Sequence, residues 1–229
     1  MSAPARRTTG EVLTATVALA GIAAIDVGCG DGTLVRLMTR AGARVTGVEP
    51  GPRMLELALA APRAGDERYL EAPAQALPFV GGIADLVVFS NSLHHVPPEH
   101  MAPALAEAAR VLKPGGTLFV SEPVADGPFF AVTRLFNDET DVRARALAAM
   151  RDAGRWGLAQ TEEFVHVTPM KSRDFAVFRD RSIAIEPSRA SVFAAREAEI
   201  RAAFEANGKR GAEGYEFDNP TRVNVFRRA

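Results

Sequence analysis

Three glycines, Gly28, Gly30 and Gly32, stand at alternate positions directly after an apolar run at residues 22–27. Apolar residues then recur at helical spacing over residues 34–38, which predicts a strand, a tight turn and a helix. Glycine lets the backbone turn sharply and approach a ligand closely, because it has no Cβ. The start of the helix also directs N–H groups at a polar or anionic group. This turn is therefore the first candidate binding site.

Two carboxylates accompany the turn. Asp26 lies inside the first apolar run, and Glu49 ends the next one, at residues 45–48. A carboxylate at the end of the second strand can accept hydrogen bonds from both hydroxyls of a ribose, and we expect Glu49 to be exposed in the empty cleft. A nicotinamide-binding turn is the main alternative, but its Gly-x-Gly-x-x-Gly/Ala pattern, counted from Gly28, places Thr33 where a small residue is needed.

The elements that must position these residues alternate between strand and helix with short connections, which is typical of a doubly wound α/β fold. We expect a mostly parallel, seven-stranded sheet with an antiparallel last strand and a helical insertion after the fifth strand. Strands are predicted at residues 22–27, 45–48, 69–71, 84–90, 117–121, 163–167 and 222–226, with a turn at 113–116. Helices are predicted at residues 10–20, 31–41, 53–60, 98–112, 141–153, 174–181 and 188–207, the last capped by Ser188.

Four further segments extend a family resemblance over about residues 22–122. They are Ala-Leu-Pro-Phe at 76–79, Asp-Leu-Val-Val at 85–88, Leu-His-His-Val at 93–96 and Val-Leu-Lys-Pro-Gly-Gly at 111–116. In this order, after the glycine turn and Glu49, they resemble the landmarks of small-molecule class I S-adenosylmethionine-dependent methyltransferases. The resemblance implies a Rossmann-like fold, S-adenosyl-L-methionine as the cofactor, and methyl transfer to a small organic acceptor at oxygen, nitrogen or carbon.

The predicted elements divide the chain into three regions. Residues 1–122 would form the cofactor-binding core, residues 123–213 a mainly helical lid that contacts the substrate, and residues 214–229 a strand that completes the core sheet. Within the core, Asp26 would receive the ammonium group of the cofactor and Glu49 its ribose hydroxyls. The remaining cofactor contacts are expected at Gly28, Cys29, Gly30, Pro50, Met54, Ala74, Gln75, Ser90 and Asn91.

One landmark of the family is missing. An acidic residue usually precedes the segment at 76–79 and meets the adenine amino group, but Pro73 stands there in this chain. Proline neither accepts through its side chain nor donates through its nitrogen. The Ala74 N–H and the side chain of Gln75 or Glu71 are the alternatives, so adenine recognition is expected to be weaker or rearranged.

His94 and His95 are the candidate catalytic residues, since they follow the fourth strand at the end where ligands bind in such sheets. The ordinary pKa of histidine suits the removal of a proton from a hydroxyl or an amine. Adjacent side chains point different ways, so at most one ring should reach the methyl acceptor. We favour His95, which is nearer the helix start at Pro98. Structural packing, positioning of the acceptor and contact with the cofactor carboxylate stay open.

The region after the fifth strand is rich in aromatic residues that suggest a partly apolar pocket. The alternative is that these residues are the ordinary core of a helical subdomain. The candidate substrate contacts are Glu122, Phe129, Phe130, Arg134, Phe136, Asn137 and Trp156.

Composition limits the remaining possibilities. A formal net charge of −1 gives no support for a nucleic-acid or anionic-membrane partner. The only cysteine, Cys29, fits a structural place in the glycine turn and a reducing, cytoplasmic location. The apolar run near the N-terminus imitates a signal peptide, but it leads directly into the strand that carries the turn. No spacing of ligating residues indicates a metal site, and the oligomeric state is left open.

Two other functions remain as alternatives. One is methylation of a macromolecule. Enzymes that methylate amino groups of nucleic acid and protein often carry the segment Asp/Asn-Pro-Pro-Tyr/Phe after the fourth strand, whereas this chain has Asn91-Ser92-Leu93-His94 there. The other is a non-catalytic, cofactor-binding protein with a methyltransferase-like fold, which Pro73 favours. Fold alone cannot decide between them, because function resides in the site.

Overall fold

The computed structural model describes residues 5–229, which form two compact units. The first, here called the core unit, comprises residues 9–122, 142–165 and 222–229. The second unit comprises residues 123–141 and 166–221, together with residues 5–8 of the N-terminal segment. As functional regions, the divisions at 1–122, 123–213 and 214–229 stay a prediction.

The sheet begins with five strands in the order β3-β2-β1-β4-β5 and continues through β8 to β6, while the short β7 pairs with β8. β1 lies between β2 and β4 and is parallel to both. The strands are β1 (Ala23–Val27), β2 (Arg44–Glu49), β3 (Arg68–Glu71), β4 (Ala84–Ser90), β5 (Leu112–Pro123), β6 (Leu158–Ser172), β7 (Lys209–Gly211) and β8 (Gly214–Arg228). β6 and β8 are long enough to contribute residues to both units.

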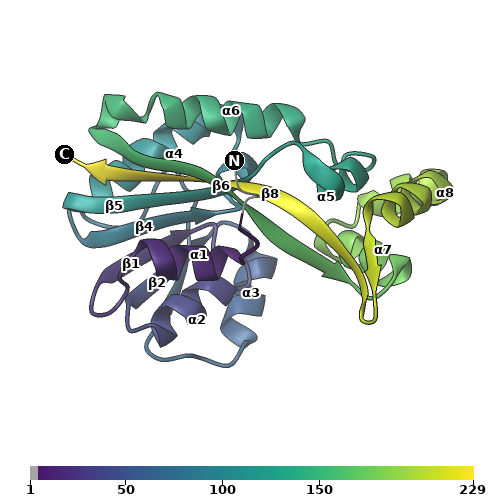
Figure 1. The fold of residues 1–229 in the computed structure, drawn as a ribbon. Helices are drawn as coiled ribbons and strands as arrows, with labels where there is room; N and C mark the ends of the chain where they lie inside the picture. The colour runs from purple at the N-terminus through teal and green to yellow at the C-terminus, as the bar shows by residue number, and fades with distance from the viewer. Residues whose placement is uncertain (1–4) are drawn as a thin grey trace. The chain divides into compact units, whose positions relative to one another are not determined.

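Both faces of the parallel strands are apolar, because successive side chains of a strand point to opposite faces. Ile25 and Val27 pack into one cluster with residues of α4 (Pro98–Val111) and α6 (Thr140–Arg151), while Ala24 packs into another with residues of α1 and α2. Figure 1 shows α1, α2 and α3 on one face of these strands and α4 and α6 on the other. The first three helices are α1 (Thr9–Thr16), α2 (Thr33–Arg40) and α3 (Pro52–Ala60).

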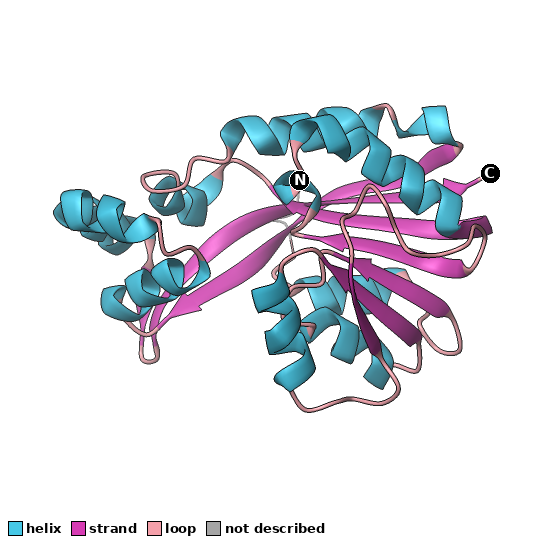
Figure 2. Cartoon of the chain, turned by 180° about the vertical axis from the view of Figure 1, so that it is seen from behind, coloured by secondary structure: helices cyan, strands magenta, loops and turns pink. Residues whose placement is uncertain are grey.

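The second unit has its own core, built from phenylalanines. Rings from α7 (Phe175–Ile185), α8 (Arg189–Asn207) and β8 pack together, and the centroids of Phe204 and Phe217 lie 4.9 Å apart. The helices of this unit are α5 (Gly127–Thr133), α7 and α8. They lie beside the parts of β6 and β8 that belong to the same unit (Figure 2). The N-terminal segment joins it, since the N–H of Arg7 donates to the Val167 carbonyl at 3.0 Å.

The fold class expected from the sequence is confirmed: a doubly wound, mostly parallel sheet of seven successive strands, antiparallel at its end, with helices inserted after β5. Three local predictions differ. Residues 113–116 lie within β5 as a bulged segment, with a shift in register against β4 and Gly115 at a φ of 74°. β6 is far longer than residues 163–167. Ser188 precedes α8 but donates its hydroxyl to Glu186 at 2.8 Å and makes no side-chain cap.

Candidate functional site

The glycine turn between β1 and α2 is tied to the neighbouring strand by its backbone. The N–H groups of Gly28 and Cys29 both donate to the Val48 carbonyl, at 2.8 and 3.1 Å. A Cβ on Gly28 would lie 2.6 Å from the Cβ of Ser92, and one on Gly32 would lie 2.6 Å from the ring of Tyr69. These two glycines are therefore required by packing within the protein itself.

Gly30 differs from its two neighbours. Its φ is 55°, yet a Cβ there would meet only the Met54 methyl group, at 3.5 Å, among the heavy atoms of the described chain. Its N–H donates to Glu49 Oε2 at 2.9 Å. Gly30 thus leaves space beside the turn that a ligand can approach, as expected for a glycine placed for binding.

Glu49 is buried, with 9% of its surface exposed, so the expectation of an exposed side chain is wrong. The reason is that its carboxylate joins two loops: Oε2 accepts from Gly30, and Oε1 accepts from the Gly51 N–H at 2.9 Å. A carboxylate oxygen can accept more than one hydrogen bond, so both oxygens retain the capacity to bind hydroxyl groups.

Asp26 is the most completely buried carboxylate of the site, with 1% of its surface exposed. No group in residues 5–229 donates a hydrogen bond to its Oδ1. Burial, and secondarily the negative charge of Glu49, raises the pKa of Asp26 to about 7. A buried carboxylate without a partner is costly, so a cationic ligand group would find a favourable position here.

The Cys29 thiol is also buried, and burial, followed by the charges of Asp26 and Glu49, raises its pKa. A raised pKa keeps the sulfur protonated and unreactive. This supports the structural place that the sequence predicted for Cys29.

The residues expected around adenine lie on separate loops of the core unit. Pro50 is exposed and Met54 half-buried near the start of α3, whereas Ala74 is buried and Gln75 half-buried between β3 and β4. Pro73 is exposed, and its carbonyl accepts from the Ala76 N–H at 3.1 Å. Among these residues, Met54 lies close to the glycine turn, beside Gly30. The adenine contacts stay predictions.

The chain turns sharply after β4. Ser90 is half-buried, and Asn91 is the one non-glycine residue at positive φ, 56°, among those described. Ser92 then donates its hydroxyl to the Val27 carbonyl at 2.6 Å, which attaches the turn to the end of β1. The 3-10 turn η1 (Leu93–His95) follows.

Glu122 organises this turn from the end of β5. It is 6% exposed, and its Oε1 accepts from the N–H groups of Ser92 and Leu93 at 3.1 and 2.8 Å. Its Oε2 forms a hydrogen bond with Nδ1 of His94. The sequence analysis placed Glu122 among the candidate substrate contacts and did not predict its hydrogen bonds to the turn and to His94. The only sign of this role in the sequence was a carboxylate at the end of a buried strand.

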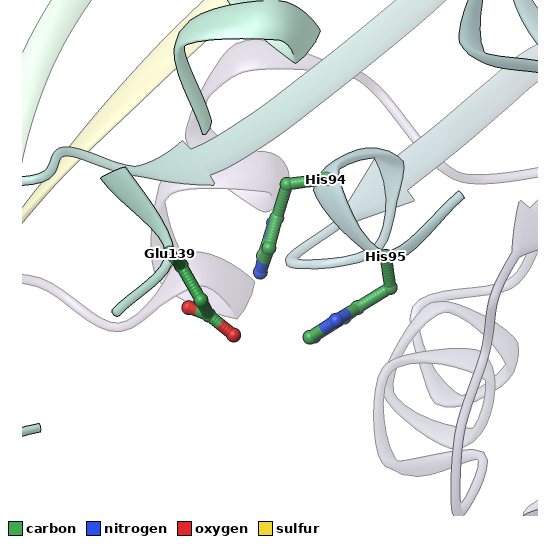
Figure 3. A group of neighbouring side chains, drawn as sticks. All are labelled: His94, His95 and Glu139. Atoms are coloured by element: carbon green, nitrogen blue, oxygen red, sulfur yellow. The ribbon is translucent and has the colours of Figure 1, made fainter. Parts of the chain in front are cut away.

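The two histidines differ in their surroundings. His94 is buried, whereas His95 is exposed, and their ring centroids are 4.0 Å apart (Figure 3). Glu139, drawn with them, belongs to the second unit. The expectation that the two side chains serve different roles agrees with this difference, while the catalytic assignment stays a prediction.

Three of the four aromatic residues expected near the substrate lie in apolar clusters. Phe129 packs edge-on against Phe178 in the second unit, at 6.3 Å between centroids, and Phe136 lies 4.7 Å from Phe193. Trp156 packs against the core unit. The alternative of an ordinary helical-subdomain core therefore describes Phe129 and Phe136, whereas Trp156 packs in the core unit.

Comparison with known proteins identifies the core. Residues 25–120 match the model of a family described as a methyltransferase domain. The match spans less than half of the chain, and over these residues the chain is similar to the class I S-adenosylmethionine-dependent methyltransferases. Members of this family use S-adenosyl-L-methionine, so the resemblance and the cofactor class inferred from the sequence are confirmed.

A relative from Mycobacterium sp. strain KMS, named an uncharacterized methyltransferase, is 39% identical over 110 residues. The match covers 48% of this chain and 42% of the relative, which is less than half of its length. A methyltransferase structure from Mesorhizobium loti is 20% identical with a TM-score of 0.57, covering 95% of this chain and 96% of that one. A Galdieria sulphuraria structure, assigned as a sarcosine dimethylglycine methyltransferase, is 17% identical with a TM-score of 0.61, covering 96% and 84%. Both structures share the fold.

None of the helices within residues 5–229 is long and apolar enough to cross a membrane.

Gly28→Ala in the methyltransferase domain should destabilise the protein more than Gly82→Ala. Both glycines have similar positive φ values, 71° and 68°, so each substitution incurs the left-handed penalty of roughly 1–2 kcal/mol. Only the Gly28 Cβ would collide with Ser92, since Gly82 has no heavy atom within 4 Å. Overpacking should add about 1–3 kcal/mol to the loss in the free energy of unfolding, measured by urea denaturation. Equal losses would contradict the packing role of Gly28.

Asp26→Asn should remove a pH dependence of stability in the ligand-free protein. The pKa of Asp26 in the folded protein, about 7, exceeds the ordinary aspartate value of 3.8, so the stabilising contribution of Asp26 is complete below pH 3.8 and is lost as the pH rises through 7. At about 1.4 kcal/mol per pKa unit, the loss between pH 3.8 and 7 is on the order of 4 kcal/mol, of which roughly 3 kcal/mol falls between pH 5 and pH 8. Urea denaturation at pH 5 and pH 8 should show the parent losing stability relative to Asp26→Asn.

Asp85→Asn is the control for this pH series. The hydrogen bond from Lys113 lowers the pKa of Asp85. The contribution of the Asp85 carboxylate to the free energy of unfolding is therefore lost only on acidification. If the difference between the parent and Asp26→Asn is the same at pH 5 and pH 8, Asp26 does not titrate in this range.

Glu49→Ala should weaken the binding of S-adenosylhomocysteine and also lower the stability of the free protein. Losing hydrogen bonds to a charged group costs roughly 1.5–3 kcal/mol of affinity, and the unpaired N–H groups of Gly30 and Gly51 add a stability loss of about 1–3 kcal/mol. Glu67→Ala is the control, because Glu67 also accepts from two backbone N–H groups, at 2.8 and 2.7 Å. Calorimetry should find the affinity reduced only in Glu49→Ala.

Proposed function

We propose that the chain is an S-adenosylmethionine-dependent methyltransferase that methylates a small organic acceptor at oxygen, nitrogen or carbon. The observation that carries the proposal is the pair of buried carboxylates, Asp26 and Glu49, at the carboxyl ends of two adjacent parallel strands. In an open parallel sheet, ligands bind beyond these ends.

The residues present match the chemical groups of the cofactor. Asp26 has an unpartnered oxygen that suits an ammonium group, and Glu49 has acceptor capacity for two ribose hydroxyls. Gly30 leaves room for the methionine part beside Met54. When bound, the cofactor supplies a methyl group on a positively charged sulfur that is already a good leaving group.

The main task of the protein is then to hold the acceptor in line with this methyl group and to exclude water. Such positioning supplies most of the rate in reactions that need little further activation. An acceptor that enters with its proton also needs a base, and the histidine pair after β4 offers one. The hydrogen bond from the Ser92 hydroxyl to the Val27 carbonyl holds that pair near the end of β1.

A small acceptor is favoured over a macromolecule by the chain's own features. The formal charge of −1 gives no electrostatic footprint for nucleic acid. The segment after β4, Asn91–His94, also departs from the pattern common in enzymes that methylate amino groups of macromolecules. A structural neighbour is assigned to the small substrates sarcosine and dimethylglycine.

Incubation with methyl-labelled S-adenosylmethionine should transfer label to a compound in a small-metabolite extract. Transfer RNA and a protein fraction, tested separately, should stay unlabelled, and S-adenosylhomocysteine should inhibit the transfer. Calorimetry should detect binding of S-adenosylhomocysteine and none of NAD. Label confined to a macromolecular fraction would favour the macromolecular alternative, and cofactor binding without any labelled product would favour the non-catalytic one.

A further inference from the structure

The N-terminal segment, residues 5–8, covers part of the open edge of the sheet. β6 is the last strand in the order of the sheet, with β8 on its other side. Val167 of β6 donates its N–H to the Ala5 carbonyl and accepts from the Arg7 N–H, each at 3.0 Å. All of these residues belong to the second unit. An edge strand without a neighbour presents unpaired N–H and C=O groups, so this pairing closes an edge that would otherwise be open.

Ion pairs with β8 also hold the segment. Arg6 pairs with Glu216 and with Asp218, the latter at 2.9 Å. The Arg6 side chain is 44% exposed, so solvent screens these pairs and each of them contributes little. Attachment therefore depends on a few weak contacts, and one further contact can decide whether the segment stays in place.

The buried side chain of His166 makes that further contact. Only 2% of His166 is exposed, and its Nδ1 lies 3.2 Å from the Arg7 carbonyl oxygen. A carbonyl oxygen only accepts hydrogen bonds, so Nδ1 carries a hydrogen and donates it. In the neutral ring Nε2 then has no hydrogen, and it is buried without a partner among residues 5–229. The bond to Arg7 therefore leaves a bare ring nitrogen inside the protein.

A second proton on this ring is unfavourable while the segment is attached. It would create a buried positive charge and an Nε2–H group without an acceptor. Burial accordingly lowers the pKa of His166; the bond to the Arg7 carbonyl opposes this less strongly, and the Arg7 guanidinium lowers the pKa further. Within residues 5–229, Arg7 is the charged group that acts on the ring, and neither β6 nor β8 contributes another.

We propose that His166 is a pH-sensitive switch whose protonation, in mildly acidic conditions, detaches residues 5–8 from β6. The proton comes from the solvent and binds the lone pair of Nε2, which reaches water once the segment leaves. The bond from Nδ1 to the Arg7 carbonyl and both backbone bonds of Val167 are then lost, so the edge of β6 is exposed. The switch does not depend on methyl transfer.

The direction of the pH dependence follows from burial. With the segment attached, the pKa of His166 lies below its ordinary value of 6.5. The contribution of His166 to attachment is therefore complete above about pH 6.5, and it is lost as the pH falls through the lowered pKa.

Hydrogen exchange of the Arg7 and Val167 amides, followed by NMR on the full chain, measures detachment directly. After correction for the intrinsic exchange rates, the protection of both amides should fall at least about threefold between pH 8 and pH 5. The Val124 amide is an internal control, since it donates to the Pro220 carbonyl at 2.8 Å within the same unit. Its protection should stay constant. An equal loss at Val124 would indicate general opening of the unit and would overturn the proposal.

His166→Asn removes the titration and keeps a donor. The amide nitrogen of asparagine stands at about the position of Nδ1, so it can still donate to the Arg7 carbonyl. Protection of the Arg7 amide should then change less than about twofold between pH 5 and pH 8. His100→Asn is the matched control, because His100 is a half-buried histidine of α4 in the core unit, and it should keep the pH dependence of the parent. A pH dependence that persists in His166→Asn would contradict the switch.

The reverse effect can be measured without changing His166. Arg7→Pro lacks the N–H that donates to Val167 and should detach the segment at every pH, whereas Arg7→Gln keeps that N–H and removes only the charge. The pKa of the His166 ring, determined by NMR titration, should rise toward 6.5 in Arg7→Pro and rise less in Arg7→Gln. Equal pKa values in the two variants would show that attachment does not act on His166, and the proposal would be wrong.

Discussion

The parallel pairing of β1 between β2 and β4 is the constraint on which the rest of the site depends. Both faces of β1 are covered by apolar side chains, so a polar ligand is excluded from the faces of the strand and is expected beyond its carboxyl end. The glycine turn begins there, and its N–H groups bond to the end of β2. The turn after β4 is attached to the same point through Ser92 and Val27. Three strand ends thereby meet around one location.

Buried carboxylates hold the loops of the core unit. Glu49, Glu67 and Glu122 each accept hydrogen bonds from two backbone N–H groups. Charge-assisted bonds of this kind are stronger than neutral ones, so loops without regular structure acquire a defined geometry. Glu49 and Glu122 also lie at the carboxyl ends of β2 and β5, the edge of the sheet at which we propose that the cofactor binds.

Asp26 stands apart because it is buried with an unpartnered oxygen. Its pKa, raised to about 7, means that the protonated form and the carboxylate coexist near neutral pH in the free protein, whereas a bound cation would favour the carboxylate. Ligand binding and proton release are therefore coupled at this residue. The free protein is therefore less stable at higher pH, where the buried Asp26 carboxylate carries a negative charge that a cationic ligand group would offset.

The sequence predicted the strand, turn and helix around Gly28–Gly32 and the parallel sheet. It also predicted that Glu49 ends the second strand. Periodicity and glycine spacing report local backbone geometry and burial, which depend on residues close together in the chain. Only the tertiary structure decided the partners of Glu49 and the bond between Glu122 and His94, which are 28 residues apart in sequence. Such contacts depend on strand order, register and the path of each turn, because these determine which distant side chains meet.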